Sequence, residues 1–580
     1  MSELNIFPGI KKLSAGHQFA VWAPHAKAVA LTGSFNDWDD NGIPLNQQDN
    51  GMWWCDVADS AHGDEYKYII TTESGERLTK NDPSARLMTN SVGNSVIYDD
   101  EFSWHTPDFT PVPIHLRVIY ELHIGTFHRK NGERGTFDSA IEKLGALKSL
   151  GINIIELMPV NEFAGDISWG YNPACPFAVE EAYGGPDGLK RFIDAAHGMN
   201  MGVIMDVVYN HFGPSDLDIW QFDGWHENNK GGIYFYNDDR STTPWGDTRP
   251  DYGREEVRSY IIDNALMWLG EFKADGLRMD MVPYMRSVSG ADNGSDDIPE
   301  AYSLIKSINQ HINERFPNKM TIAEDLHHHN FITDTLGNDG CGYTSQWDAA
   351  FVHPVRHVLT QASDDHVNLD EIQSALLKQY SQRPFARVIY TESHDEVANG
   401  KARLVEEIAP GNVDDDFFAR QKGMLAATMV FTTAGVPMLF QGQEFKETGW
   451  FNDSDDLDWS RRDTFSEYVK AFTSLIALRN GTDSRTAGLT GGGTEIIHRD
   501  DAHNVIGFIR SNGHQHESVY VYLHFGRDEI GQYTLNGLPE HAKCVFAWSN
   551  GLYAESVSVS ENALTLTPYG IWIFTAGQQH

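Results

Sequence analysis

This chain of 580 residues has few cysteines and little positive charge. Its four cysteines, Cys55, Cys175, Cys341 and Cys544, are scattered and show no CxxC spacing. They are therefore expected to be free thiols in a reducing compartment, not a disulfide framework. Lys and Arg number 44 against 82 Asp and Glu, which gives a formal net charge of −38. Nucleic acids and anionic membranes need a basic footprint, so this charge argues against both as partners and favours a neutral ligand.

Long apolar runs are missing as well. No segment reaches transmembrane length, and Met1–Pro8 lacks the basic stretch followed by an apolar stretch that secretory signals have. We therefore expect a cytoplasmic protein that does not insert into a membrane, and we make no prediction of its oligomeric state. Hydrophobic residues make up 41% of the chain, which is enough apolar material for a large packed core.

The N-terminal part, residues 1–105, has an all-β pattern. His17–Trp22 and Ala28–Gly33 are short apolar stretches separated by turn-forming residues. Tryptophan is concentrated in this part, and its side chain fills small β cores well, so a core role is favoured over a sugar-stacking platform. The residues concerned are Trp22, Trp38, Trp53 and Trp54. The expected fold is a small β-sandwich.

From residue 106 to 483, apolar strands alternate with helical patterns. One helix is expected over 137–150, where Phe137, Ile141, Leu144, Leu147 and Leu150 recur at helical spacing. About eight strand–helix units result, the number in a closed (β/α)8 TIM barrel, and this makes the fold class α/β. An open doubly wound sheet is the alternative, but no GxGxxG motif follows the first strand. The expected strands lie near 118–122, 152–157, 203–208, 276–279, 320–323, 343–347, 387–390 and 436–440.

Beyond residue 483 the helical period stops. Strand-like stretches at 505–509, 519–523 and 570–575 predict a separate all-β domain over residues 484–580. Within the barrel, the longest loops follow the third and fourth strands, at about 212–250 and 285–300. Loops of that length in a compact domain are usually functional.

Four of the expected barrel strands lead into a carboxylate or a carboxylate–histidine pair. The segments are Val203–His211, Asp275–Asp280, Thr321–Glu324 and Tyr390–Asp395. The carboxyl ends of barrel strands meet at one face, so these side chains should converge on one cleft. Paired carboxylates in such a cleft cleave glycosidic bonds. A purely structural ion-pair network is the alternative, and the coincidence of four strand ends argues against it.

Two of these carboxylates suit a retaining mechanism. Asp280 follows Arg278 by two residues, so both side chains share one face and the guanidinium keeps the carboxylate ionised, as a nucleophile requires. Asp206 is expected beside Arg278, on the neighbouring strand. Glu324 precedes Asp325, whose like charge is expected to raise the pKa of Glu324 toward the range of a general acid. A separation of about 5–5.5 Å between the two carboxyl groups would indicate a covalent glycosyl–enzyme intermediate.

Together the four segments resemble the characteristic regions of the α-amylase family of glycoside hydrolases and transglycosylases, and the resemblance covers most of the chain. It implies that Asp280 is the nucleophile, Glu324 the general acid/base and Asp395 a third carboxylate that binds sugar hydroxyls. It also implies that Tyr171 stacks on the sugar. Further substrate-binding or supporting roles are implied for Asp206, His211, Arg278, His394 and Trp169.

Other segments resemble particular branches of that family. Gly33–Trp38 is similar to the β-sandwich carbohydrate-binding module, family 48, that precedes the barrel in branching, debranching and trehalose-releasing members. Ser393–Lys401 and Met438–Phe445 are similar to glycogen branching enzymes. Asp206–Pro214 and Thr243–Gly246 are closer to maltooligosyltrehalose trehalohydrolases.

The resemblance favours a 1,4-α-glucan branching-type transglycosylase, which cleaves an α-1,4 bond and moves the chain to a 6-hydroxyl. The alternative is a hydrolase of the α-amylase or trehalohydrolase type. A non-catalytic glucan-binding protein is disfavoured because Asp280 and Glu324 are both present. The expected substrate is an α-1,4-glucan or maltooligosaccharide.

No metal site or cofactor is predicted. Asn210 matches a calcium-ligand position of many amylases, so a calcium requirement stays open. His327–His329 follows Glu324 closely, but adjacent histidines on an extended segment point to alternating sides, which argues against a metal site.

Overall fold

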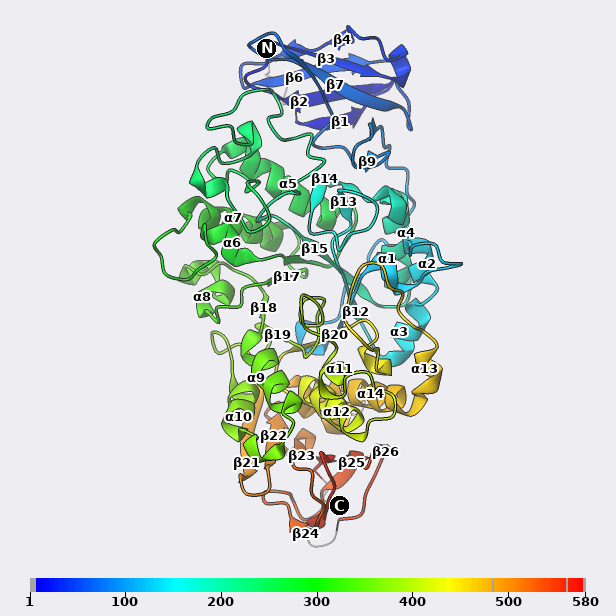
Figure 1. Cartoon of the computed structure of the whole chain (residues 1–580), viewed down its shortest axis with the longest axis vertical. Coiled ribbons are helices and arrows are strands. Elements are labelled where there is room, and N and C mark those ends of the chain that lie inside the picture. Colours follow the sequence, from blue (N-terminus) through cyan, green and yellow to red (C-terminus); the bar gives the residue numbers. More distant parts are fainter. Residues whose placement is uncertain (1–6, 482–483, 560–561, 577–580) are drawn as a thin grey trace.

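The computed structural model describes residues 7–481, 484–559 and 562–576. The molecule is elongated, with the N-terminal sheets at one end, a parallel barrel in the middle and the C-terminal sheets at the other end (Figure 1). Within these ranges no helix combines the length and the apolar character needed to span a membrane. The expected boundary at residue 483 and most of the segment considered as a secretory signal lie outside the described residues.

The N-terminal part consists of two antiparallel sheets that pack around Phe19, Leu31, Tyr66 and Tyr68. The expected strands over 17–22 and 28–33 are confirmed as β2 and β3. One sheet contains β1 (Gly9–Lys12), β2 (His17–Trp22), β6 (Met52–Val57) and β5 (Asn46–Gln47). The other contains β4 (Ile43–Pro44), β3 (Ala28–Gly33), β7 (Glu65–Thr71), β10 (Ser95–Val96), β9 (Leu87–Met88) and β8 (Arg77–Lys80).

The tryptophans of this part do not all have the same role. Trp53 is buried in its core, as predicted, and Trp54 is partly buried against that core, whereas Trp22 is buried edge-on against Tyr234 of the barrel part at 5.7 Å. Trp38 follows the short turn η1 (Ser34–Asn36) and is 38% exposed. The prediction of a role in this core therefore holds for Trp53 and not for the exposed Trp38.

The central part is a closed barrel of eight parallel strands, in which β11 pairs with β20 to complete the ring. This confirms the predicted (β/α)8 barrel and excludes the open sheet. The strands are apolar and buried because helices cover their outer face and side chains fill the interior. They are β11 (Ile119–Leu122), β12 (Ile154–Leu157), β15 (Gly202–Val207), β16 (Gly276–Met279), β17 (Met320–Ala323), β18 (Ser345–Trp347), β19 (Arg387–Ile389) and β20 (Val436–Phe440).

Helices surround the barrel, and one expected helix is split in two. The stretch 137–150 forms α2 (Phe137–Ile141) and α3 (Leu144–Leu150), because Glu142 and Lys143 form hydrogen bonds to carbonyls three residues back and tighten the chain between them. The long helices are α4 (Gly185–Gly198), α5 (Glu255–Gly270), α7 (Pro299–Arg315), α9 (Ala349–Thr360), α10 (Leu369–Leu377), α12 (Phe417–Thr432) and α14 (Ser466–Arg479). The short ones are α1 (Ile124–Phe127), α6 (Val282–Arg286), α8 (Asn330–Thr333), α11 (Leu404–Ile408) and α13 (Arg461–Thr464).

A hairpin after the second barrel strand was not predicted from the sequence. It pairs β13 (Asn161–Phe163) with β14 (Pro173–Val179) and carries Trp169 and Tyr171 in its connection. Pro173 and Pro176 lie within β14, and proline normally argues against a paired strand, so the sequence pattern concealed this element.

The C-terminal part is a six-stranded antiparallel sheet with a smaller two-stranded sheet. The three stretches expected as strands lie in β22, β23 and β28. The larger sheet contains β21 (Gly493–Asp500), β22 (Val505–Ser511), β23 (Val519–His524), β28 (Ile571–Thr575), β25 (Lys543–Ser549) and β26 (Leu552–Ala554). The smaller one pairs β24 (Ile530–Thr534) with β27 (Ala563–Leu566).

Candidate active site

The fully buried guanidinium of Arg278 connects three carboxylates at the mouth of the barrel. Its Nη1 lies 2.7 Å from Asp206 Oδ2 and 2.9 Å from Asp280 Oδ1, and its Nη2 lies 2.9 Å from Glu324 Oε2. The ring of Trp347 packs against the guanidinium at 4.3 Å. Three adjacent strands, β15, β16 and β17, supply these residues, and Asp206 is in register with Arg278. The structure thus brings together four residues of the predicted site, namely Asp206, Arg278, Asp280 and Glu324.

Asp280 is held in place from two sides. Besides its ion pair with Arg278, it accepts a hydrogen bond of 2.8 Å from Asn210 Nδ2, which also donates to its backbone oxygen at 2.9 Å. Both contacts fix the position of the carboxylate. The chain then turns sharply at Met281, whose φ of 38° is unusual for a residue with a side chain, and enters α6. Asn210 therefore positions this carboxylate, a role that its match to a calcium-ligand position did not suggest.

Glu324 is buried and accepts a 2.7 Å hydrogen bond from the backbone N–H of Met281. Burial, with the charges of Asp280 and Asp395, raises the pKa of Glu324 to about 8 against the opposing charge of Arg278. Asp325, expected to be the source of this shift, is not among its main causes, because its carboxylate pairs with Arg286 at 2.9 Å. The shift leaves Glu324 protonated at neutral pH, which is the state that a general acid needs.

We expect activity to fall as the pH rises through about 8, because Glu324 is the general acid in its protonated form and loses that proton there. Initial rates across this range, measured at subsaturating substrate, report the pKa in the free enzyme. A circular dichroism spectrum recorded at each pH separates this loss from unfolding. A rate that stays constant well beyond this pH would contradict the assignment.

A second group of predicted residues lies beside Asp206. The hydroxyl of Tyr171 donates to Asp206 Oδ2 at 2.5 Å, and its ring stacks on His394 at 4.9 Å between centroids. The ring of Trp169 lies edge-on to that of His394, at 5.8 Å between centroids. Asp395 Oδ2 lies 3.6 Å from His394 Nε2, and its side chain is 42% exposed. All four predictions therefore fall in one cluster, with Asp395 facing the solvent.

Two buried carboxylates of this cluster were missed from the sequence. Glu121 of β11 pairs with His394 Nδ1 and also accepts the backbone N–H of His394. Burial alone would lower the pKa of His394, but Asp395 and Glu121 outweigh it and raise the value to about 9, so the ring is an imidazolium. Glu156 of β12 is also buried, and burial raises its pKa well above the usual range. The available signal was a charged residue inside each of two otherwise apolar strands.

The long loop after β15 places Trp245 over His211. Their rings stack at 4.7 Å with an interplanar angle of 13°. Trp245 also packs edge-on against Tyr284 of α6 at 5.1 Å and remains 37% exposed. His211 itself is buried, with Nε2 2.9 Å from the backbone oxygen of Tyr171. The site is therefore flanked by aromatic rings on two sides, and the sequence had assigned no role to Trp245.

No group of three or more His, Cys, Asp and Glu side chains within the described ranges could hold a metal ion. The four cysteines are free thiols. The absence of a cofactor remains a prediction, and the sequence leaves the calcium requirement open.

Two family models and several known proteins are similar to this chain. Residues 9–85 match the model of carbohydrate-binding module 48, the isoamylase N-terminal domain, and residues 89–217 and 217–487 match that of the alpha amylase catalytic domain. A protein of Corynebacterium jeikeium named 1,4-alpha-glucan branching enzyme is 30% identical over 92% of this chain and 76% of its own length. A Marinobacter nauticus protein of the same name is 30% identical over 88% of this chain and 83% of its own length.

Solved structures share the fold. A type I pullulanase from Bacillus subtilis, complexed with maltose, superposes with a TM-score of 0.78 at 20% identity, over 99% of this chain and 86% of its own. The pullulanase of Bacillus acidopullulyticus gives a TM-score of 0.76 at 20% identity, over 98% of this chain and 75% of its own. The family models and the similarity to the two curated relatives show that this chain belongs to the α-amylase family, glycoside hydrolase family 13.

Proposed function

We propose that this protein is a 1,4-α-glucan branching enzyme. The observation that carries the proposal is the similarity, over most of the chain, to relatives that bear this name. Asp280 and Glu324, the pair of carboxyl groups that a retaining mechanism uses, both contact Arg278, and the charge of Asp395 acts on Glu324. The substrate proposed is an α-1,4-glucan or a maltooligosaccharide chain.

The first half of the reaction breaks an α-1,4 bond. Glu324 gives its proton to the glycosidic oxygen while Asp280 attacks C1 from the opposite face, so the leaving chain departs with a free 4-hydroxyl. The product is a covalent β-glycosyl ester of Asp280. Arg278 pairs with Asp280 at 2.9 Å and orients it for this attack, and Asp395 and His394 would bind hydroxyls of the sugar that is cleaved.

The second half decides between branching and hydrolysis. Glu324, now a carboxylate, takes the proton from the 6-hydroxyl of an acceptor glucan, whose oxygen attacks C1 and releases Asp280. If water takes the place of that hydroxyl, the result is hydrolysis. Glu324, the proposed general acid, accepts a hydrogen bond from Met281, the N-cap residue of α6. Tyr284 belongs to the same short helix, and Trp245 packs against Tyr284, so both rings lie near the general acid. We propose that Trp245 holds the acceptor.

Incubation with amylose tests the proposed function. Branching shortens the linear runs that bind iodine, so the iodine absorbance should fall without new reducing ends. Rising reducing ends would instead support an α-amylase-type hydrolase, and release of trehalose from maltooligosyltrehalose would support the trehalohydrolase alternative. Either of these two results would overturn the branching proposal.

Trp245→Ala is expected to lower the ratio of transfer to hydrolysis by roughly 10-fold. This is about the change in affinity that follows when one aromatic stacking contact and its buried apolar area are lost. The ratio of new α-1,6 linkages to new reducing ends measures the change. Cleavage of an activated donor, which needs no acceptor, should change little. A variant with an unchanged ratio would exclude Trp245 as an acceptor contact.

We further propose a cytoplasmic location. The supporting observation is that the four cysteines are free and that Cys55, Cys175 and Cys341 are buried. Free thiols are typical of reducing compartments. Fractionation of the source cells tests this assignment.

A further inference from the structure

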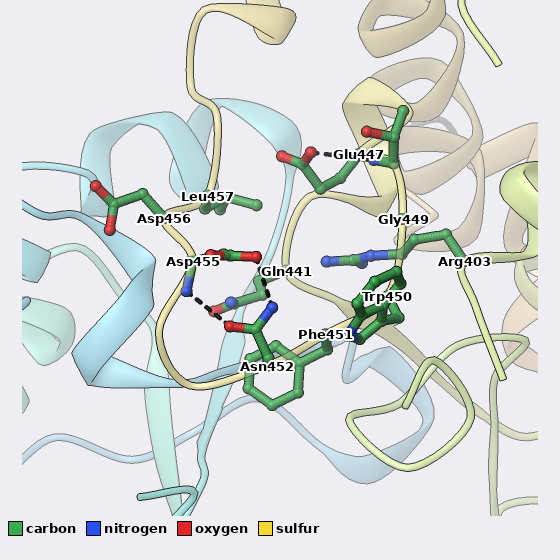
Figure 2. Close-up of a pocket in the computed structure, with 11 residues that line it drawn as sticks. Arg403, Gln441, Glu447, Gly449, Trp450, Phe451, Asn452, Asp455, Asp456 and Leu457 are labelled. Atoms are coloured by element: carbon green, nitrogen blue, oxygen red, sulfur yellow. Dashed lines mark hydrogen bonds between the residues drawn. The ribbon is translucent and has the colours of Figure 1, made fainter. Parts of the chain in front are cut away.

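A pocket of about 300 Å³ lies beside the candidate active site, between Arg403 and the segment 447–457 that follows β20 (Figure 2). That volume is at the lower end for small-molecule sites. The pocket adjoins the site through ring contacts. Phe451, which lines it, lies 5.3 Å from Trp169, and Trp169 in turn contacts His394. A linear ligand held at His394 can therefore reach the pocket by passing over Trp169.

The lining of the pocket combines an exposed aromatic ring with carboxylate and amide groups. Trp450 is 66% exposed and presents the face of an aromatic ring beside the pocket. Asn452 Nδ2 donates to Asp455 Oδ2 at 2.6 Å, and this bond fixes the carboxylate. Glu447 and Asp456 also line the pocket. This set suits a neutral polyhydroxyl ring, which offers an apolar face and many hydroxyl donors, and it disfavours an anion.

Arg403 supplies the opposite wall and is 3% exposed. Its Nη1 lies 3.2 Å from Glu392, and its guanidinium packs over Phe440 at 4.8 Å. These contacts fix a side chain that points into the pocket in Figure 2. A guanidinium carries only N–H donors, so the part of Arg403 that lines the pocket favours a ligand with acceptor oxygens.

We propose that this pocket, lined by Arg403, Trp450 and Asp455, binds a glucose unit of the donor α-glucan and sets the minimum length of the chain that is transferred. The pocket lies on the Trp169 side of the site. Trp245 and Tyr284 form the other flank, near the general acid, where the leaving chain departs and the acceptor enters. The chain that stays attached to Asp280 is therefore the one that reaches the pocket. The statement on transferred length rests on the proposed branching function, whereas glucan binding in the pocket does not.

Binding is tested in the inactive Asp280→Asn enzyme, so that maltooligosaccharides are not consumed. Trp450→Ala in that enzyme should weaken maltoheptaose binding by roughly 10-fold and leave maltose binding unchanged, because only the longer chain spans both sites. Asp455→Asn, which keeps the shape of the side chain, should give a smaller loss of the same kind. Phe417→Ala removes an exposed ring of α12 (37% exposed) and serves as the control.

Product analysis tests the length statement in the active enzyme. Branches made by Trp450→Ala should be shorter on average than those of the parent once they are released by a debranching enzyme. Equal affinity of the Trp450→Ala variant and its parent for maltoheptaose would overturn the proposal. If the active protein makes reducing ends instead of branches, the branching function fails, and the binding series still decides whether the pocket holds a glucan.

Discussion

Replacing Asp280 with asparagine is expected to lower kcat/KM on amylose by roughly 10⁴-fold or more, because an amide cannot form the glycosyl ester through which a retaining reaction passes. The fold should persist. Arg278 would still be paired with Asp206 at 2.7 Å, so its buried charge is not left alone. Initial rates and the thermal unfolding midpoint are measured together, so that lost chemistry is separated from lost structure.

A mass measurement makes this test specific to the covalent step. A fluorinated maltosyl fluoride, which forms the glycosyl ester quickly and releases it slowly, should add one glycosyl mass to the parent enzyme and none to the Asp280→Asn variant. Asp138→Asn makes the same chemical change on the outer helix α2, where Asp138 pairs with Arg191, and should leave the rate unaltered. Labelling of the Asp280→Asn variant would show that another residue is the nucleophile.

The barrel and the centre of its site follow from local patterns. Each of the strands β15, β16 and β17 is an apolar run that leads into a carboxylate, and the carboxyl ends of parallel strands meet at one face. The convergence on Arg278 could therefore be predicted from period-2 alternation and strand order. The same reasoning found the barrel strands but not the hairpin β13–β14, where prolines concealed the strand pattern.

The rest of the site depends on contacts between distant segments. Glu121 supports His394 across 273 positions in sequence, and no local pattern predicts such a pair. The source of the raised pKa of Glu324 was also misjudged, because the neighbour in sequence, Asp325, pairs with Arg286 while Asp280 and Asp395 act through space. Trp245 illustrates the same limit, since its stacking on His211 depends on the path of a long loop.

Replacing Glu324 with glutamine is expected to lower the rate on amylose by about 10³-fold, within the range usual for loss of a general acid and base. The loss should depend on the donor. Maltosyl fluoride has a leaving group that needs no proton, so the first step should proceed and the glycosyl–enzyme should accumulate. Azide, a nucleophile that needs no base, should then restore turnover and give an α-glycosyl azide, because two inversions retain the configuration. The Asp280→Asn variant should gain nothing from azide.

The Glu324→Gln variant also tests how the protonation of Glu324 makes the free energy of unfolding depend on pH. The folded-state pKa of Glu324, about 8, lies above the value of 4.5 for an unburied side chain, so folding binds a proton between these two values. The free energy of unfolding of the parent should therefore decrease as the pH rises from about 4.5 through about 8. Glutamine carries no such proton, so the Glu324→Gln variant should lose less stability over that interval in denaturant titrations at a series of pH values. A parallel loss in both proteins would mean that the Glu324 carboxyl is not held protonated by its burial, and the assignment of the general acid would fail with it.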